Sequence, residues 1–165
     1  MRARLLLLAG LLLAGTARAD EPPLLSLAFR FAGGVAMDAG PQTAWRVAPF
    51  GVGVGAEGAF RTQPWASIYG LAIVEGTTLH AGGAAGVRFR PGDDGALRFG
   101  LGVSALLAPS TLFGLQASTG GCGKPGAVRL CAELEATAYV AGDLLPANQV
   151  STQLRVALEL GFDVL

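Results

Sequence analysis

Charged residues, aromatic residues and cysteines are all scarce in this chain. Of its 165 residues, 15% are charged, 7% are aromatic and only two are cysteine, and the formal net charge is zero. A chain without an excess of basic residues is poorly suited to nucleic acid, which is bound by a basic surface. Intrinsic disorder is excluded as well, because 52% of the residues are hydrophobic and disordered chains have low hydrophobicity.

Long apolar runs are also missing beyond the first 19 residues, because Arg, Glu or Gly interrupts every hydrophobic segment. A membrane-spanning helix needs roughly 18–20 apolar residues in a row. The sequence beyond residue 19 therefore predicts no such helix.

The N-terminus has the three parts of a secretory signal peptide. Residues 1–4 contain two arginines, residues 5–13 are apolar, and residues 17–19, Ala-Arg-Ala, form a small-x-small cleavage site. We therefore expect residues 1–19 to be removed and residues 20–165 to form one exported domain. The leader takes three of the 12 basic residues with it, so nine remain against 12 acidic residues.

Alternation of apolar and polar residues runs through most of the exported chain. In residues 153–164 every second residue is apolar, and one face holds Leu154, Val156, Leu158, Leu160, Phe162 and Val164. A β-strand places alternate side chains on opposite faces, whereas a helix would scatter these residues around its circumference. The same period indicates strands at 25–32, 46–57, 79–90, 97–105 and 130–141.

Two further segments and the turns between segments complete the predicted fold. Residues 65–74 are apolar on both faces and residues 111–118 are short, so their register is left open. Gly, Pro and Asp, which turns require, gather between the segments at 38–41, 61–64, 75–77, 91–95, 108–110, 120–126 and 142–146. Seven such turns predict an all-β fold, a single eight-stranded antiparallel up-and-down β-barrel.

Charged residues keep to the non-apolar face of these strands, where many of the intervening residues are Gly or Ala. The face includes Asp163 and a candidate network of Arg30, Glu57, Arg88, Arg90, Arg98, Glu133, Glu135, Arg155 and Glu159. Strands whose water-facing side consisted of Gly and Ala would pair weakly, because glycine makes no cross-strand side-chain contacts. A narrow barrel lumen, by contrast, has room for small residues beside a few long ones.

Two kinds of β-barrel are compatible with this pattern. In a transmembrane β-barrel the apolar face meets lipid, and charges of both signs pair within the lumen. In a soluble exported barrel, periplasmic or secreted, the apolar face turns inward and binds an apolar small molecule, as lipocalins do. The placement of charges beside Gly and Ala favours the transmembrane barrel, and the soluble carrier is the alternative.

The leader, the eight candidate strands and the alternating last strand at 151–165 together resemble small outer-membrane β-barrel proteins of the OmpA/OmpX type. The resemblance covers the whole exported chain and is one of pattern. It implies a bacterial outer-membrane protein that contacts the lipid bilayer, is inserted by the outer-membrane assembly machinery and has a structural or envelope role. The last strand of that family usually ends in an aromatic residue, whereas this chain ends in Leu165, with Phe162 three residues earlier.

The two cysteines, Cys122 and Cys131, lie nine residues apart on either side of a predicted turn. An exported chain meets an oxidising compartment, so we expect a disulfide between them. Cys122 is expected in the loop and Cys131 on the lumen face, which would put the bond at the barrel rim. Two thiols and one distant histidine fall short of the usual four zinc ligands, so no metal and no cofactor are expected.

No set of catalytic residues can be assigned, and we expect no enzymatic activity. A hydrolytic site would pair a histidine with a serine nucleophile, but His80, the only histidine, has no serine two residues after it. We therefore expect His80 to form hydrogen bonds at the rim or in the lumen. Glu133 and Glu135 are expected to pair with arginines instead of acting as acid and base. Asp93 and Asp94 are expected in a hairpin turn and not at a calcium ion.

Overall fold

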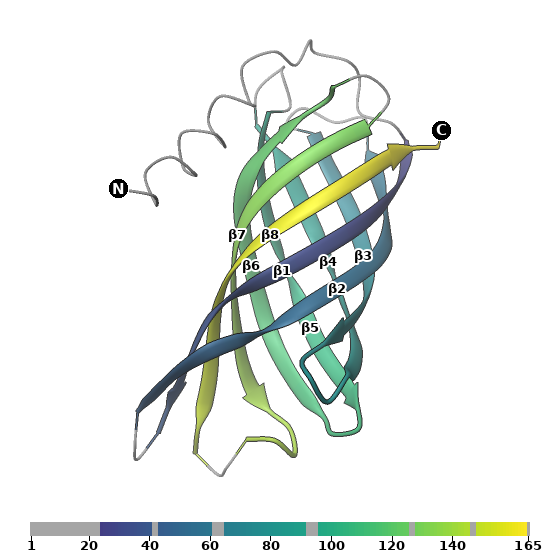
Figure 1. Cartoon of the computed structure of the whole chain (residues 1–165). Helices are drawn as coiled ribbons and strands as arrows, with labels where there is room; N and C mark the ends of the chain where they lie inside the picture. The colour runs from purple at the N-terminus through teal and green to yellow at the C-terminus, as the bar shows by residue number, and fades with distance from the viewer. Residues whose placement is uncertain are drawn as a thin grey trace.

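The computed structural model describes residues 24–40, 43–60, 65–91, 96–125, 128–145 and 148–164. Its eight strands close into one barrel, in which each strand pairs antiparallel with the next and β1 pairs with β8 (Figure 1). The strands are β1 (Leu25–Ala39), β2 (Ala44–Phe60), β3 (Trp65–Glu75), β4 (His80–Arg90), β5 (Leu97–Ala108), β6 (Leu112–Gly123), β7 (Val128–Ala141) and β8 (Val150–Asp163). The predicted eight-stranded up-and-down barrel is confirmed.

Some sequence-based expectations concern residues outside the described ranges. The predicted signal peptide, residues 1–19, lies outside the described residues, and so do Asp93 and Asp94. The segments at 65–74 and 111–118, whose register was open, form β3 and most of β6. Among the described residues, no helix is long and apolar enough to cross a membrane.

Alternation along each strand decides which side chains face the barrel interior. In β8, Arg155 and Glu159 are buried, whereas Val156 and Leu158 between them are 59% and 58% exposed. Every strand contributes to the apolar outer surface, with exposed residues that include Phe29, Val54, Ile68, Val87, Leu101, Leu115, Leu134 and Leu158. The barrel therefore has a polar interior and an apolar exterior.

The two ends of the barrel differ. At one end, here called the terminal end, β1 begins and β8 ends; at the other, the hairpin end, β1 turns into β2 (Figure 1). The β1–β2 hairpin projects beyond β3, because β2 first pairs with β3 at Gly51 while it pairs with β1 from Ala44 onward. Trp45 and Val47 lie on this projecting hairpin and are 70% and 82% exposed.

The predicted turn at 120–126 is wrong in its first half. Residues 120–123 continue β6 and pair with β7, with Gly120 opposite Glu133 and Cys122 opposite Cys131. A Cβ at Gly120 would clash with the backbone of Ala132 and Glu133. Glycine is needed here because the two strands approach each other closely. The glycines at 120–123 resembled a turn, so the predicted strand ended too early.

Two further glycines allow close packing in the barrel wall beside Tyr69. Gly86 on β4 pairs in register with Tyr69 on β3 and with Gly102 on β5. A Cβ at Gly86 would clash with the backbone of Leu101 and Gly102, and a Cβ at Gly102 would lie 2.6 Å from Tyr69 Oη. Glycine is therefore the residue that fits both positions without a shift of the strands.

We expect Gly86→Ala to lower the free energy of unfolding by about 1–3 kcal/mol, the usual cost of overpacking. Gly70→Ala is the matched control, because Gly70 is exposed on β3 and an added Cβ meets nothing within 4 Å. It should be neutral or slightly stabilising, since alanine loses less backbone entropy than glycine. Urea unfolding followed by circular dichroism measures both variants, and equal effects would contradict the close packing at Gly86.

Candidate functional site

The barrel interior contains a network of buried charged side chains. All nine charged residues predicted to line the lumen are at most 7% exposed. Two more charged residues share this environment, so the buried set is Arg30, Arg88, Arg90, Arg98, Arg129, Arg155, Glu57, Glu75, Glu133, Glu135 and Glu159. Ion pairs connect these residues across the barrel, so the predicted enclosed charge network is present.

Sequence reasoning missed Glu75 and Arg129 for two different reasons. Glu75 is the last residue of β3, but the predicted strand ended at residue 74 and Glu75 was placed in the turn at 75–77, so no face was assigned to it. Arg129 lies just before the predicted strand at 130–141, yet β7 begins at Val128. Extending the alternation of Cys131, Glu133 and Glu135 by one step would have found Arg129.

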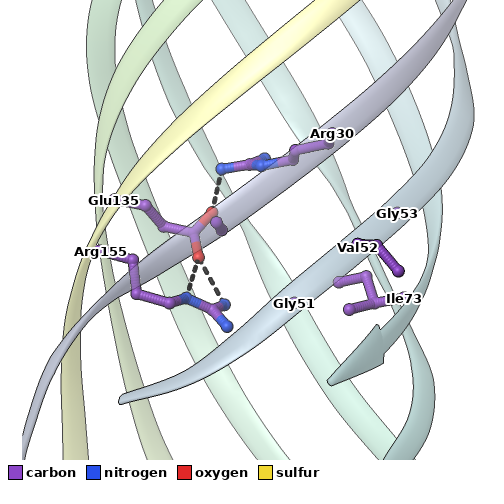
Figure 2. Close-up of a pocket in the computed structure, with 8 residues that line it drawn as sticks. Arg30, Gly51, Val52, Gly53, Ile73, Glu135 and Arg155 are labelled. Carbon is purple, nitrogen blue, oxygen red and sulfur yellow. Dashed lines mark hydrogen bonds and ion pairs between the residues drawn. The ribbon is translucent and has the colours of Figure 1, made fainter. Parts of the chain in front are cut away.

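The part of the network nearer the hairpin end is organised around Glu135. Figure 2 shows the Glu135 carboxylate between Arg30 and Arg155, with the small residues Gly51 and Gly53 on the opposite wall. Arg155 Nε and Nη2 both donate to Glu135 Oε1, at 3.0 and 2.6 Å, and Arg30 Nη2 donates to Oε2. The cavity beside this cluster measures about 20 Å³, which is room for about one water molecule.

Glu75 ties this cluster to the opposite wall of the barrel. Arg155 Nη1 donates to Glu75 Oε2 at 2.5 Å, while Nε and Nη2 of the same guanidinium donate to Glu135. A Cβ at Gly51 would lie 3.4 Å from Glu75 Cβ and 3.8 Å from Arg155 Nη1. The wall at Gly51 therefore lies at van der Waals distance from the Arg155–Glu75 ion pair.

The part of the network nearer the terminal end is organised around Glu57. Arg90 Nη2 donates to Glu57 Oε1 at 2.6 Å. The other oxygen, Oε2, accepts from three more guanidiniums, at 3.0 Å from Arg88 Nη1, 3.3 Å from Arg98 Nη1 and 3.4 Å from Arg129 Nη2. Four arginines therefore converge on one carboxylate.

Arg98 and Arg88 join the two clusters through Glu133 and Glu159. Arg98 Nε donates to Glu133 Oε1, and Arg98 Nη1 lies 2.9 Å from Glu159 Oε1. Arg88 Nη2 donates to Glu159 Oε2 at 3.0 Å. Glu133 in turn lies 3.5 Å from Arg30 of the first cluster. A buried charge is tolerated when it is paired in this way, and the pairing holds side chains from opposite walls together.

The interior becomes apolar beyond the charge network, toward the hairpin end. Leu106, Leu112 and Tyr139 form a buried cluster, against which Leu145 packs. Tyr139 Oη lies 3.4 Å from Ser104 Oγ, at hydrogen-bonding distance. Charged and apolar side chains thus fill successive levels of the barrel, an arrangement suited to blocking passage and bracing the wall.

The disulfide between Cys122 and Cys131 is confirmed, but the predicted loop position of Cys122 is wrong. The bond joins β6 and β7 across a directly opposed pair whose Cα atoms are 4.1 Å apart. Cys122 lies in β6 and not in a loop, and both cysteines are buried. The bond therefore links two paired strands one residue before β6 ends, because β6 continues past the glycines that were expected to form the turn.

We expect the double variant Cys122→Ser/Cys131→Ser to lose about 2–3 kcal/mol of stability, the chain-entropy estimate for a short closed loop. Urea unfolding of oxidised wild type and of the variant measures the loss. Treatment with dithiothreitol provides the control, because reductant should destabilise the wild type by a similar amount and leave the variant unaffected. A variant as stable as the oxidised protein would contradict a stabilising role for the bond.

The remaining candidate residues lie at the ends of strands. His80 pairs in register with Glu75, and its buried Nδ1 has no hydrogen-bond partner among the described residues. Asp163, expected on the charged face, forms a partly exposed ion pair with Lys124 at 2.9 Å. Among the described residues, no three His, Cys, Asp or Glu side chains are grouped so that they could hold a metal ion.

Comparison of the chain with protein-family models, with curated proteins and with solved structures finds no match. The likeness to small outer-membrane barrels is therefore one of strand number, closed antiparallel topology and alternation.

Proposed function

We propose that the chain is an integral β-barrel protein of a bacterial outer membrane with a structural role in the envelope. In this proposal residues 1–19 direct export and are removed, and both termini of the barrel lie on the periplasmic side. The outer-membrane assembly machinery inserts the barrel, and lipid acyl chains are its main partner. No enzymatic activity forms part of the proposal.

The observation that carries the proposal is the inverted polarity of the barrel. Eleven charged side chains are buried inside, while apolar residues such as Leu101, Leu115 and Leu158 are 58–63% exposed outside. Soluble monomers rarely expose a continuous apolar surface of more than a few hundred Å². A hydrocarbon environment makes this surface favourable, and strands of 11–17 residues reach or exceed the roughly 9–11 needed to cross a bilayer.

The shape of the outer surface adds to this support. An open apolar groove of about 270 Å³ runs over β1, β2 and β3 on the outside of the barrel, lined by residues that include Phe29, Phe31, Val54 and Val74. Such a groove could seat part of an acyl chain. A soluble carrier of the lipocalin kind needs its apolar site inside, where this barrel has an ion-pair network, so the groove and the network together favour the membrane protein.

The filled interior argues against a channel for solutes. Arg155 spans from Glu135 to Glu75 across the interior, and the apolar cluster of Leu106, Leu112 and Tyr139 lies beyond it. Moving these groups apart would leave charges without partners, which is costly in a narrow interior. We therefore propose a barrel that stabilises its membrane without conducting.

Fractionation of cells that produce the full chain tests the proposal. We expect the protein in outer membranes, released by detergent and not by high salt or carbonate, with a gel mobility that changes on heating. Planar bilayers containing the purified protein should show no conductance above background. Recovery in the soluble fraction with a bound lipid would contradict the membrane proposal and favour the carrier.

A further inference from the structure

Among the residues that the structure describes, the buried network contains one more positive than negative charge. Its six arginines and five glutamates are all at most 7% exposed, and arginine does not deprotonate in proteins. An unpaired charge in such an interior is costly unless something compensates it. The position of the surplus charge can be found by following each arginine to its carboxylates.

Four of the six arginines have at least two carboxylate partners each. Arg30 and Arg155 share Glu135, and each has a second glutamate within 3.5 Å. Arg88 and Arg98 each contact Glu159 in addition to Glu57. Their charges are therefore matched within the network.

Arg90 and Arg129 are different. In the described part of the chain, each contacts only Glu57, which Arg88 and Arg98 already share. Arg129 adds a hydrogen bond from Nη2 to Ser26 Oγ at 2.9 Å, but a hydroxyl brings no negative charge. The surplus charge therefore lies with this pair, near the terminal end where β4 ends and β7 begins.

Unpartnered hydrogen-bond donors occur around the same carboxylate. The Nε atoms of Arg90 and Arg129 are buried and have no acceptor among the described residues, and the same holds for Arg88 Nε and Arg98 Nη2. Both side chains also contact the carboxylate of Glu57, at 2.6 and 3.4 Å on its two oxygens, so both guanidiniums lie beside that carboxylate. Buried N–H groups of charged side chains normally have a partner.

We infer that Arg90 and Arg129 form a binding site for one small monovalent inorganic anion, of which chloride is the simplest. The anion balances the surplus charge and accepts hydrogen bonds from the two guanidiniums. It enters from the terminal end, where the two arginines keep 7% and 6% of their surface exposed. The inference depends only on the contents of the interior and not on whether lipid surrounds the barrel.

Thermal unfolding of the purified protein in two salts tests the site. Circular dichroism follows unfolding in chloride and in gluconate, an anion too bulky for the interior, at equal ionic strength. We expect chloride at about ten times its Kd to lower the unfolded fraction about tenfold relative to gluconate. Arg129→Gln should abolish the difference between the salts. Arg30→Gln, which removes an arginine whose charge is matched, should lower stability and preserve the difference.

Diffraction from crystals of the wild-type protein grown in bromide locates the anion without any variant. We expect an anomalous peak between the guanidiniums of Arg90 and Arg129. The inference is overturned if the site contains no bromide peak, or if chloride stabilises Arg129→Gln as much as the wild type. Either result would mean that water alone satisfies the two arginines.

Discussion

Replacing Arg98 with glutamine should lower the free energy of unfolding by about 3–5 kcal/mol, the cost of breaking a buried ion pair from one side. The Arg98 side chain is 0% exposed and contacts Glu57, Glu133 and Glu159. Glutamine is shorter and uncharged, so it leaves Glu133 and Glu159 with weakened compensation in a buried setting. Urea unfolding of the detergent-solubilised protein, followed by circular dichroism, measures the loss.

The matched control is the same substitution at an exposed arginine. Arg46 forms an ion pair with Asp38 at 2.9 Å on the projecting hairpin, where its side chain is 42% exposed. An exposed pair contributes about 0–1 kcal/mol because water and salt screen it, so Arg46→Gln should have little effect. If Arg98→Gln were as mild as Arg46→Gln, the interior network would not be what holds the barrel walls together.

Local alternation was enough to predict most of the fold, because a closed barrel needs little more than strands with two distinct faces. The last strand shows this most clearly, since each residue from Ser151 to Phe162 lies on the face that alternation assigns to it. Strand ends were harder to predict. β1 continues to Ala39 although its alternation weakens at Gly33 and Gly34, where the pairing with β2 shifts register. A single sequence does not reveal that a neighbouring strand supplies partners on the far side of such an irregularity.

The candidate site was predictable in composition but not in pairing. Parity placed Arg30 and Glu135 in the interior, yet their contact spans 105 residues of sequence and depends on the stagger of the strands around the barrel. The convergence of four arginines on Glu57 follows from that stagger too. Alternation assigns each side chain to a face, and only the closed barrel determines which charges meet across it.

Replacing Leu158 with arginine should cost about 2–4 kcal/mol if the barrel lies in a bilayer, the range for a charged side chain on the lipid face at mid-depth. Leu158 is 58% exposed on the outer face of β8, between Phe31 of β1 and Ala132 of β7 in register. In water the same exposed substitution would change stability by about 0.5 kcal/mol or less. Folding into phosphatidylcholine vesicles at increasing urea concentrations, followed by tryptophan fluorescence, measures the difference.

Val47→Arg is the control that separates lipid exposure from exposure in general. Val47 is 82% exposed, but it lies on the projecting hairpin beyond the first β2–β3 pair at Gly51, where we expect water or headgroups. Arginine there should be tolerated, because the cost of a charge falls to about 0–1 kcal/mol near the membrane interface. A large penalty at Leu158 together with a small one at Val47 would locate the hydrocarbon along the barrel. Small penalties at both positions would mean that water surrounds the apolar surface, and the outer-membrane proposal would have to be abandoned.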